Sequence, residues 1–504
     1  VVGIVGNEIT DDTRVKRVAA TAVAAGYQSL ILYPTPEEKN GTILMGNVEV
    51  YRIQVPNKAN DAFHRYLKPI KEFNKNEITA RHAAWKARKH AIYRILGSQL
   101  NDPKKNTFIR TRKKLRMKGI RLLIITKHPF FKVRMLFHFF SQRLKNLLLL
   151  RKSQVRSYLA KKFKRYEWLD FDLHFGPVLE QLQPKLIHAH DIHMLGVAVN
   201  AARNLRKKGF DTKVIYDAHE LIEGLEHVEK SIIQRWLRHE KEYIHEVDEV
   251  TCVSEPQSKR IQTRYNLDTP PKVILNCPIL DTREEEIETI RDQVNIQGKI
   301  LVYHGKVSDE RGIDTLVKSL EFLDQEIHIV ILCKEYSHWT DRLISISREI
   351  SKRVPTAEKR LHFLPYVPAE DLPIYLSTAD IAVIPLLPTK NHEVAMPNKL
   401  FESMQARLPI LSSDREALAS YIKENKIGAI YKDNDPIELA KQAHSILLRS
   451  NEIKASYNDE MIFKSSWESQ SEKLISIYND LVPAPNVNIK RVRLTDTQLQ
   501  EQQR

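Results

Sequence analysis

The polar residues best suited to chemistry in this 504-residue chain follow a hydrophobic run near residue 385. Asn398 and Lys399 stand at the predicted start of a short helix, and Glu402 follows less than two turns later. A helix start offers free N–H groups and a positive dipole end to an anion such as phosphate. Lys399 would add a positive charge, and the carboxylate of Glu402 could accept hydrogen bonds from vicinal hydroxyls. These residue types predict a site for a phosphate attached to a sugar, and a nucleotide is the natural candidate.

Two buried strands are predicted to position this site. The segment 380–414, ADIAVIPLLPTKNHEVAMPNKLFESMQARLPILSSD, has the pattern of a strand, a polar loop, a helix and a second strand. In an open α/β sheet, ligands bind beyond the carboxyl ends of the strands, where this helix would begin. An ordinary βαβ unit with a surface loop would show the same pattern, so the segment alone leaves both interpretations open.

A second segment, LVYHGKVSDERGIDTLVKSLEFL at residues 301–323, repeats the order of strand, basic loop and amphipathic helix. Gly305 would let the backbone approach a ligand, while Lys306 and Arg311 could form charge-assisted hydrogen bonds with phosphate oxygens. A single Gly-Lys pair is weak evidence. Two loops suited to anions in the same half of the chain make a nucleotide site the better interpretation.

Together with PNKLFE at residues 397–402, these segments resemble the nucleotide-sugar domain of GT4-family glycosyltransferases, which have the GT-B fold. The amino-terminal half is similar to the same family: DTRV at residues 12–15 matches the family's opening, and Gly6 and Asn7 match its loop at the cleft. Strand ends of the expected kind recur at residues 185–196, 214–221, 249–256 and 272–278. The resemblance covers residues 1 to about 55 and 170 to about 482.

The resemblance implies an α/β protein of the GT-B fold, in which two Rossmann-like domains face a central cleft and the N-terminal domain carries a basic helical insertion. The predicted parts are an acceptor-side domain at 1–278 with the insertion at about 60–168, a nucleotide-sugar-binding domain at 279–456, terminal helices at 457–482 that cross back to the first domain, and a disordered tail at 483–504.

The family's chemistry would be transfer of a sugar from a nucleoside-diphosphate donor, with retention of configuration and without a metal or cofactor. Lys306 and Arg311 would stabilise the leaving diphosphate, on which negative charge builds as the glycosidic bond breaks. His190 is the third catalytic candidate. The donor-binding candidates are Gly6, Gly305, Lys306, Arg311, Asn398, Lys399, Leu400 and Glu402. The acceptor or cleft candidates are Asn7, Arg14, His190, Asp191, His219, Glu220 and Glu393.

One departure from the family pattern concerns its two glutamates, which are often separated by seven residues. Glu402 fits the second, but Val394 occupies the position of the first, and Glu393 is one residue out of register. Recognition of the donor sugar therefore does not carry over. A one-residue adjustment of the loop could still bring Glu393 inward.

The segment HAHDIH at residues 188–193 could suggest a metal site. His188 and His190 share one face of a predicted strand, but neither a Glu-x-x-His helix nor a cysteine pair completes a ligand shell. A structural histidine and a cleft residue are both better interpretations than a metal ligand. The match of residues 170–172, DFD, to the metal-binding motif of the other glycosyltransferase fold is interpreted as chance.

The positive charge of the chain is concentrated in one block. Residues 101–165 contain 21 lysines and arginines against one acidic residue, whereas the whole chain has a net charge of +16. Residues 130–152 are amphipathic at helical spacing but too short in apolar run to cross a bilayer. The predicted partner is an anionic membrane surface, with Arg134, Phe139, Phe140 and Lys145 as membrane-facing candidates. Packing on the protein's own core is the main alternative, and nucleic acid is disfavoured because no reading motif is present.

Composition predicts where the protein works. Cys252, Cys277 and Cys333 show no paired spacing, and no signal peptide is recognisable, so we expect a cytoplasmic protein on the inner face of the cell membrane. The acceptor would be a glycan or a lipid-linked precursor of a cell-surface glycan. Two other functions stay open: a nucleotide-sugar epimerase of the same fold, and a non-catalytic scaffold that binds a nucleotide sugar or a polyanion.

Overall fold

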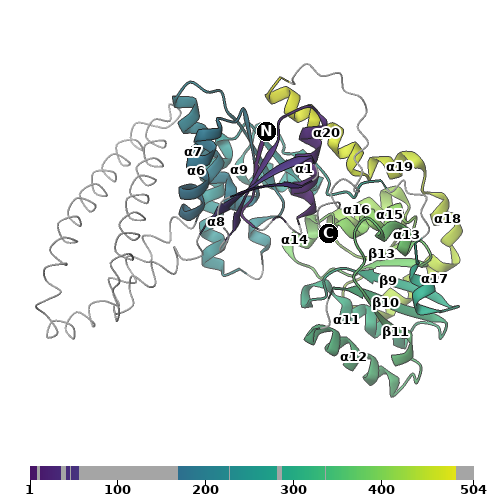
Figure 1. Ribbon diagram of the computed structural model, residues 1–504. Coiled ribbons are helices and arrows are strands. Elements are labelled where there is room, and N and C mark those ends of the chain that lie inside the picture. Colours follow the sequence, from purple (N-terminus) through teal and green to yellow (C-terminus); the bar gives the residue numbers. More distant parts are fainter. Residues whose placement is uncertain are drawn as a thin grey trace, which may run out of the picture. The chain divides into compact units, whose positions relative to one another are not determined.

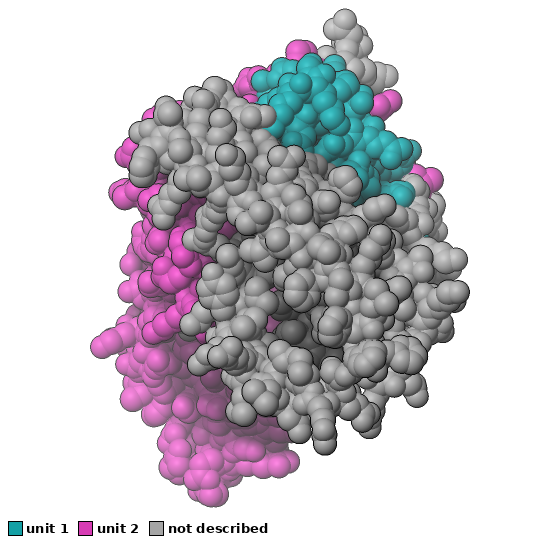
Figure 2. Space-filling model, turned by 90° about the vertical axis from the view of Figure 1, so that its left-hand side faces the viewer, with its two compact units in different colours: residues 1–11, 30–43, 49–215 teal, residues 12–29, 44–48, 216–504 magenta. Residues whose placement is uncertain are grey.

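The computed structural model describes residues 1–7, 9, 12–35, 41–45, 47–55, 168–225, 228–280, 287–334 and 337–483. The chain divides into two compact units, which Figure 2 colours teal and magenta. The first comprises residues 1–11, 30–43 and 49–215, and the second comprises residues 12–29, 44–48 and 216–504. Both contain parallel strands and helices, and the predicted α/β fold class is confirmed (Figure 1).

The predicted membrane-binding segment lies outside the described residues, including Arg134, Phe139, Phe140 and Lys145, and so do residues 484–504 of the predicted tail. Over the ranges that the structure does describe, no helix is both long enough and apolar enough to cross a membrane.

An eight-stranded sheet has the order β3-β4-β2-β1-β5-β6-β7-β8. Its strands are β1 (Val2–Ile4), β2 (Leu30–Thr35), β3 (Gly41–Met45), β4 (Val48–Gln54), β5 (Leu186–His190), β6 (Lys213–Ala218), β7 (Glu249–Cys252) and β8 (Lys272–Val273). The accompanying helices are α1 (Thr13–Ala24), α6 (Leu169–Leu182), α7 (Asp191–Lys207), η1 (Ile222–Gly224), α8 (Lys230–Tyr243), η2 (Ile244–Glu246) and α9 (Glu255–Tyr265). Connections through helices between parallel strands bring the carboxyl ends of the strands to one edge.

A six-stranded parallel sheet has the order β11-β10-β9-β12-β13-β14. Its strands are β9 (Lys299–His304), β10 (Ile327–Cys333), β11 (Leu361–Pro365), β12 (Ile381–Ile384), β13 (Ile410–Ser413) and β14 (Gly428–Tyr431). The helices up to β12 are α10 (Ile290–Val294), η3 (Asp309–Arg311), α11 (Ile313–Lys318), η4 (Ser319–Glu321), α12 (His338–Ser351), η5 (Glu358–Arg360) and α13 (Leu372–Leu376). Those after β12 are α14 (Lys390–Val394), α15 (Asn398–Gln405), α16 (Glu416–Asn425), α17 (Pro436–Leu448), α18 (Ser450–Ala455), α19 (Asp459–Lys464) and α20 (Trp467–Leu481). The predicted helix opening near Asn398 and its two flanking strands are confirmed.

The six-stranded sheet is buried on both faces, which explains why its strands read as nearly continuous hydrophobic runs. Leu301 and Tyr303 of β9 pack into the core formed with α11, α12 and α17. Ile300 and Val302, which alternate with them, pack on the opposite side against α10 and α13. Because successive side chains of a strand point to opposite faces of the sheet, one apolar segment contributes to both cores.

Helix α20 is held against α1 by a buried tryptophan. Trp467 is fully buried, and its indole N–H donates to the hydroxyl of Thr21 (2.9 Å). Its backbone N–H donates to the carbonyl of Pro278 (2.8 Å). At the other end of the helix, the hydroxyl of Tyr27 donates to the side-chain oxygen of Asn479 (2.6 Å). Segments more than 400 residues apart in the sequence thus share one core.

Arg360 should stabilise the six-stranded domain through its buried guanidinium, which is only 1% exposed. The guanidinium donates to the carbonyls of Leu320, Leu323, Asp324 and Ile327. Arg360→Met keeps most of the apolar stem but removes these donors, so we expect the free energy of unfolding to fall by about 2–3 kcal/mol. Urea unfolding followed by circular dichroism would measure the change. The control Arg353→Met removes an exposed ion pair with Glu321 and should cost much less stability, because solvent screens such a pair. Equal losses in the two variants would contradict the prediction.

Candidate active site

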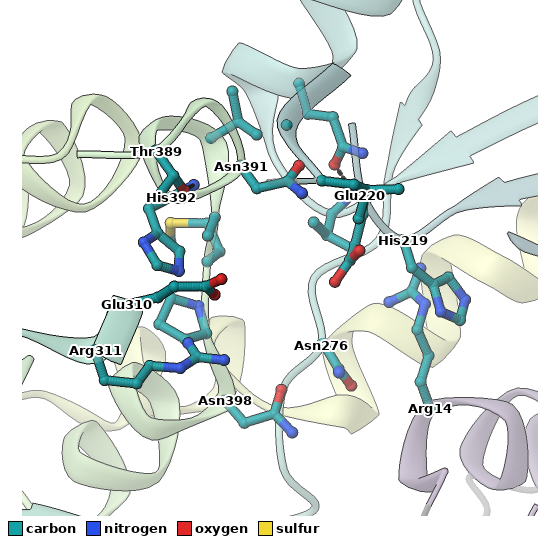
Figure 3. Close-up of a pocket in the computed structure, with 18 residues that line it drawn as sticks. Arg14, His219, Glu220, Asn276, Glu310, Arg311, Thr389, Asn391, His392 and Asn398 are labelled. Carbon is teal, nitrogen blue, oxygen red and sulfur yellow. Dashed lines mark hydrogen bonds between the residues drawn. The ribbon is translucent and has the colours of Figure 1, made fainter. Parts of the chain in front are cut away.

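A pocket of about 300 Å³ lies in the second unit, at the loops that follow strands of both sheets. Figure 3 shows its polar side chains, among them Arg311, His392 and Asn398 on one side and Arg14, His219 and Asn276 on the other. Lining side chains of both charges, together with amides and imidazoles, suit a polar, charged ligand.

The loop after β9 brings Arg311 into this pocket. Gly305 has φ +110° at the end of the strand, and η3 then carries Arg311. Gly312 has φ +65°, and a Cβ atom there would lie 1.9 Å from the carbonyl oxygen of Pro385. Only glycine allows this close approach to the chain after β12, so the loop can turn sharply into α11 while Arg311 faces the pocket.

The helix predicted to bind phosphate begins in the pocket wall. Pro397 is the N-cap of α15 and forms no side-chain cap, and both Pro397 and Asn398 line the pocket. The first N–H groups of such a helix have no partner within the helix, which suits an anion. Leu400, in contrast, is fully buried in the apolar core with Phe401 and Met404. Its side chain anchors the helix in that core.

Glu402 and Lys399 of α15 contact consecutive residues at the end of β9. The Nε2–H of His304 donates to the carboxylate of Glu402 (3.0 Å), and both residues are buried. The Nζ of Lys399 lies 3.9 Å from the centre of the Tyr303 ring. The pKa of Lys399 is lowered to about 7, chiefly by burial of its amine and then by the positive charge of Arg311. Lys306 is exposed, and its backbone carbonyl accepts a hydrogen bond from the Tyr303 hydroxyl (2.6 Å).

Glu393 forms an ion pair behind the pocket wall and does not line the pocket. Its carboxylate accepts hydrogen bonds from the guanidinium of Arg415 and from the backbone N–H of Glu416 (3.0 Å) at the start of α16. Arg415 is 3% exposed and also pairs with Asp433. Glu393 does not line the pocket, whereas Val394 does. The one-residue shift noted in the sequence therefore has a structural counterpart: this glutamate holds the loop in place.

Residues absent from the sequence prediction also form the pocket wall. The Nδ1–H of His392 donates to the carbonyl of Leu387 (2.8 Å), and burial lowers the pKa of this imidazole while that hydrogen bond acts in the opposite direction. The side-chain oxygen of Asn391 accepts from the backbone N–H of Leu221 (2.8 Å). Asn276 and Glu310 complete the wall. The only signal was their position in polar loops after strands, which many surface residues share.

A buried carboxylate organises the other side of the pocket. Asp217 accepts from the Nε and a terminal nitrogen of Arg14 (both 2.8 Å), from the hydroxyl of Thr251 (2.8 Å) and from the Nε2–H of His219 (2.8 Å). Burial alone would lower the pKa of Arg14, but the Asp217 carboxylate outweighs it and raises that pKa. Arg14, His219 and the predicted Glu220 all line the pocket.

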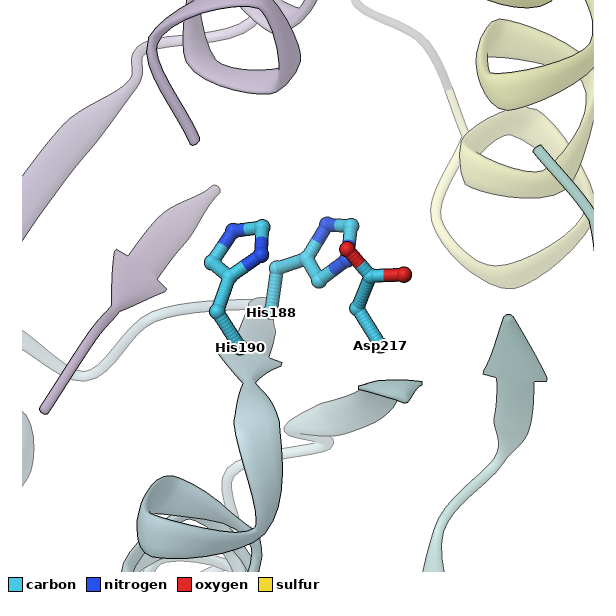
Figure 4. Close-up of side chains that lie close together, drawn as sticks. All are labelled: His188, His190 and Asp217. Atoms are coloured by element: carbon cyan, nitrogen blue, oxygen red, sulfur yellow. The ribbon is translucent and has the colours of Figure 1, made fainter. Parts of the chain in front are cut away.

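Four predicted residues, Gly6, Asn7, His190 and Asp191, belong to the first unit. His190 is fully buried and its ring stacks on that of His188, with centroids 4.4 Å apart. Figure 4 draws these two histidines, which belong to strand β5, together with Asp217 of β6. Asp191 starts α7 with φ +62°, a conformation uncommon for a residue other than glycine. A Cβ atom at Gly6 would lie 3.0 Å from the Cβ atom of His193, so the loop packs closely on this helix.

Two family models match consecutive parts of the chain. The model described as Glycosyltransferase Family 4 matches residues 113–279, and the one described as Glycosyl transferases group 1 matches residues 298–449. The chain belongs to the GT4-type glycosyltransferases. The predicted family is therefore confirmed, and so is the predicted GT-B fold.

Solved structures with the GT-B fold are similar to this GT4-type glycosyltransferase. Sucrose-phosphate synthase from Thermosynechococcus elongatus has a TM-score of 0.58 and 14% identity, covering 96% of this chain and 99% of that one. A glycosyltransferase from Rickettsia africae has a TM-score of 0.55 and 11% identity, covering 96% and 98%. HepE of Anabaena in complex with UDP has a TM-score of 0.55 and 11% identity, covering 95% and 99%.

A curated relative is similar over a shorter stretch. Spore coat protein SA of Bacillus subtilis is 24% identical over 198 residues. This alignment spans 38% of the present chain and about half, 52%, of the relative.

Proposed function

We propose that this glycosyltransferase moves a sugar from a nucleoside-diphosphate donor to a glycan or lipid-linked acceptor, with retention of configuration and without a metal ion. The observation that carries the proposal is the meeting of Arg311 with the uncapped start of α15 in one pocket wall. A guanidinium and free N–H groups are the donors that a diphosphate requires. HepE of Anabaena, which shares the fold, was crystallised with UDP and with UDP-glucose, so uridine nucleotides are the first donors to test.

In the proposed reaction, the pocket stabilises the leaving diphosphate. As the glycosidic bond breaks, negative charge develops on the phosphate oxygens. The positive charges of Arg311 and Lys306 and the positive end of the α15 dipole would stabilise this negative charge. Glu402, held by His304, would accept hydrogen bonds from the ribose hydroxyls. Arg14, His219 and Glu220 would contact the acceptor or the transferred sugar from the other side. We assign no residue a covalent role.

The charge of residues 101–165 supports the lipid-linked alternative for the acceptor. A block with 20 net positive charges would hold the enzyme on an anionic bilayer, where each surface cation contributes about 1 kcal/mol. The enzyme would then meet a membrane-bound acceptor on the cytoplasmic face. Sedimentation with vesicles of anionic lipid, compared with vesicles of neutral lipid, would test this attachment.

A thermal-shift screen tests the donor site directly. We expect UDP, or another nucleoside diphosphate in the set of UDP, GDP and ADP, to raise the melting temperature of the wild type. A ligand at a hundredfold excess over its Kd stabilises the folded protein by about 2.7 kcal/mol. Arg311→Ala should lose the shift. The control Arg348→Ala removes an exposed cation of α12 that pairs with Glu358, and this variant should keep the shift in melting temperature. A shift of equal size in Arg311→Ala would contradict the site.

A further inference from the structure

The amine of Lys399 occupies the place where the end of β9 and the start of α15 meet. Its Nζ lies 3.9 Å from the centre of the Tyr303 ring and 3.6 Å from the position that a Cβ atom would take on Gly305. The Tyr303 ring is itself fixed, because it is fully buried and its hydroxyl donates to the backbone carbonyl of Lys306 (2.6 Å). The aromatic face therefore forms a rigid support for the amine of Lys399, whose neighbour in the chain, Asn398, lines the pocket.

Burial of the amine works against its protonation by removing water, and the positive charge of Arg311 acts in the same direction, whereas the carboxylate of Glu402 favours the protonated form. Glu402 on the same helix is the opposing carboxylate, but His304 already donates to it (3.0 Å). The result is a lysine whose pKa is lowered to about 7. A diphosphate bound beside it would reverse the balance, since an adjacent anion favours the charged form of an amine.

We propose that Lys399 is a mobile phosphate ligand that rests on the Tyr303 ring in the empty site and takes up one proton from solvent as it engages the diphosphate of the donor. This inference rests on the proposed function of the site. The amine gains the proton and the buffer loses it, so no other reactant is needed. Binding of the donor then depends on pH through this residue: affinity is highest below about pH 7 and falls by about tenfold per pH unit above it, until the pKa of the bound state is reached.

Isothermal titration of the full-length protein with UDP tests the proposal. The titration is run at pH 8 in buffers with different enthalpies of ionisation, and the slope of the observed enthalpy against the buffer's value counts the protons taken up. UDP is already fully ionised at this pH. We expect an uptake close to one proton for the wild type, because an amine of pKa about 7 is about nine-tenths neutral at pH 8.

Two variants distinguish proton uptake by Lys399 from its contact with the diphosphate. Lys399→Arg keeps a cation that stays protonated, so it should bind UDP with no proton uptake and little change in affinity between pH 7 and pH 9. Lys399→Met should bind about 10- to 100-fold more weakly at pH 6.5, again without uptake. Proton uptake that persists in Lys399→Arg, or wild-type binding without any uptake, would overturn the role of Lys399 while leaving the donor site intact. Failure of the wild type to bind UDP, GDP or ADP at any pH would overturn the proposed function and this inference with it.

Discussion

Arg311→Ala should lower the rate of sugar transfer by about 10²- to 10³-fold while leaving the fold intact. The reason is that Arg311 lies in the wall of the pocket beside Asn398 at the start of α15, where the leaving diphosphate would develop its charge. Removal of one preorganised donor from such a site typically costs about 3–4 kcal/mol of transition-state stabilisation. Release of the nucleoside diphosphate from the donor identified by the thermal-shift screen would measure the rate.

Two comparisons make this result specific. Arg311→Lys retains the charge but not the planar array of donors, so its activity should fall between that of the wild type and that of Arg311→Ala. Arg348→Ala, an exposed arginine paired with Glu358, should remain within twofold of the wild type. If Arg311→Ala had the wild-type melting temperature and an activity within twofold of the wild type, Arg311 would not be part of the donor site.

Asp217→Asn should lower the free energy of unfolding by about 3–5 kcal/mol. Asp217 is fully buried and accepts from Arg14, Thr251 and His219. Asparagine offers one oxygen in place of two and carries no charge, so the guanidinium of Arg14, 3% exposed, would be left buried without its counter-ion. Loss of one partner from a buried ion pair is costly for this reason. Chemical unfolding monitored by circular dichroism would measure the loss.

Asp211→Asn provides the matched control. Its carboxylate is 78% exposed and pairs with Lys213 at the surface, so the same substitution should change the free energy of unfolding by less than about 1 kcal/mol. A second readout concerns the pocket: because Asp217 orients both Arg14 and His219, any Asp217→Asn protein that remains folded should also lose transfer activity. Equal stability of Asp217→Asn and Asp211→Asn would show that the buried pair of Arg14 and Asp217 does not stabilise this part of the pocket wall.

Much of the fold was predictable because apolar periodicity marks strands and helices locally. The strand, loop and helix order of residues 380–414 appears in the structure as β12, α14, α15 and β13. The same reasoning placed Gly305 at a strand end, where its φ of +110° now shows why glycine is required. These are features of short segments, whose conformation depends mainly on neighbouring residues.

Side-chain roles in the site were less predictable, since they depend on partners far away in the sequence. Glu393 looked like a displaced donor-sugar ligand, but its carboxylate braces Arg415, 22 residues away. His392, its neighbour in the chain, points into the pocket instead (Figure 3). Adjacent residues of a short helix face different directions, and a spacing counted along the sequence does not say which one faces the ligand.

The fold class, the family and the two loops that carry the basic residues could be recognised from the residues alone, because hydrophobic periodicity and contiguous motifs are local properties. Which charged side chains pair within the protein, and which face the pocket, depends instead on tertiary contacts. Arg14 and Asp217 are 203 residues apart, and their pairing depends on burial that no local pattern reveals. The seat of Lys399 on Tyr303 has the same origin, since the environment that lowers the pKa of an amine is built by residues from separate strands and helices.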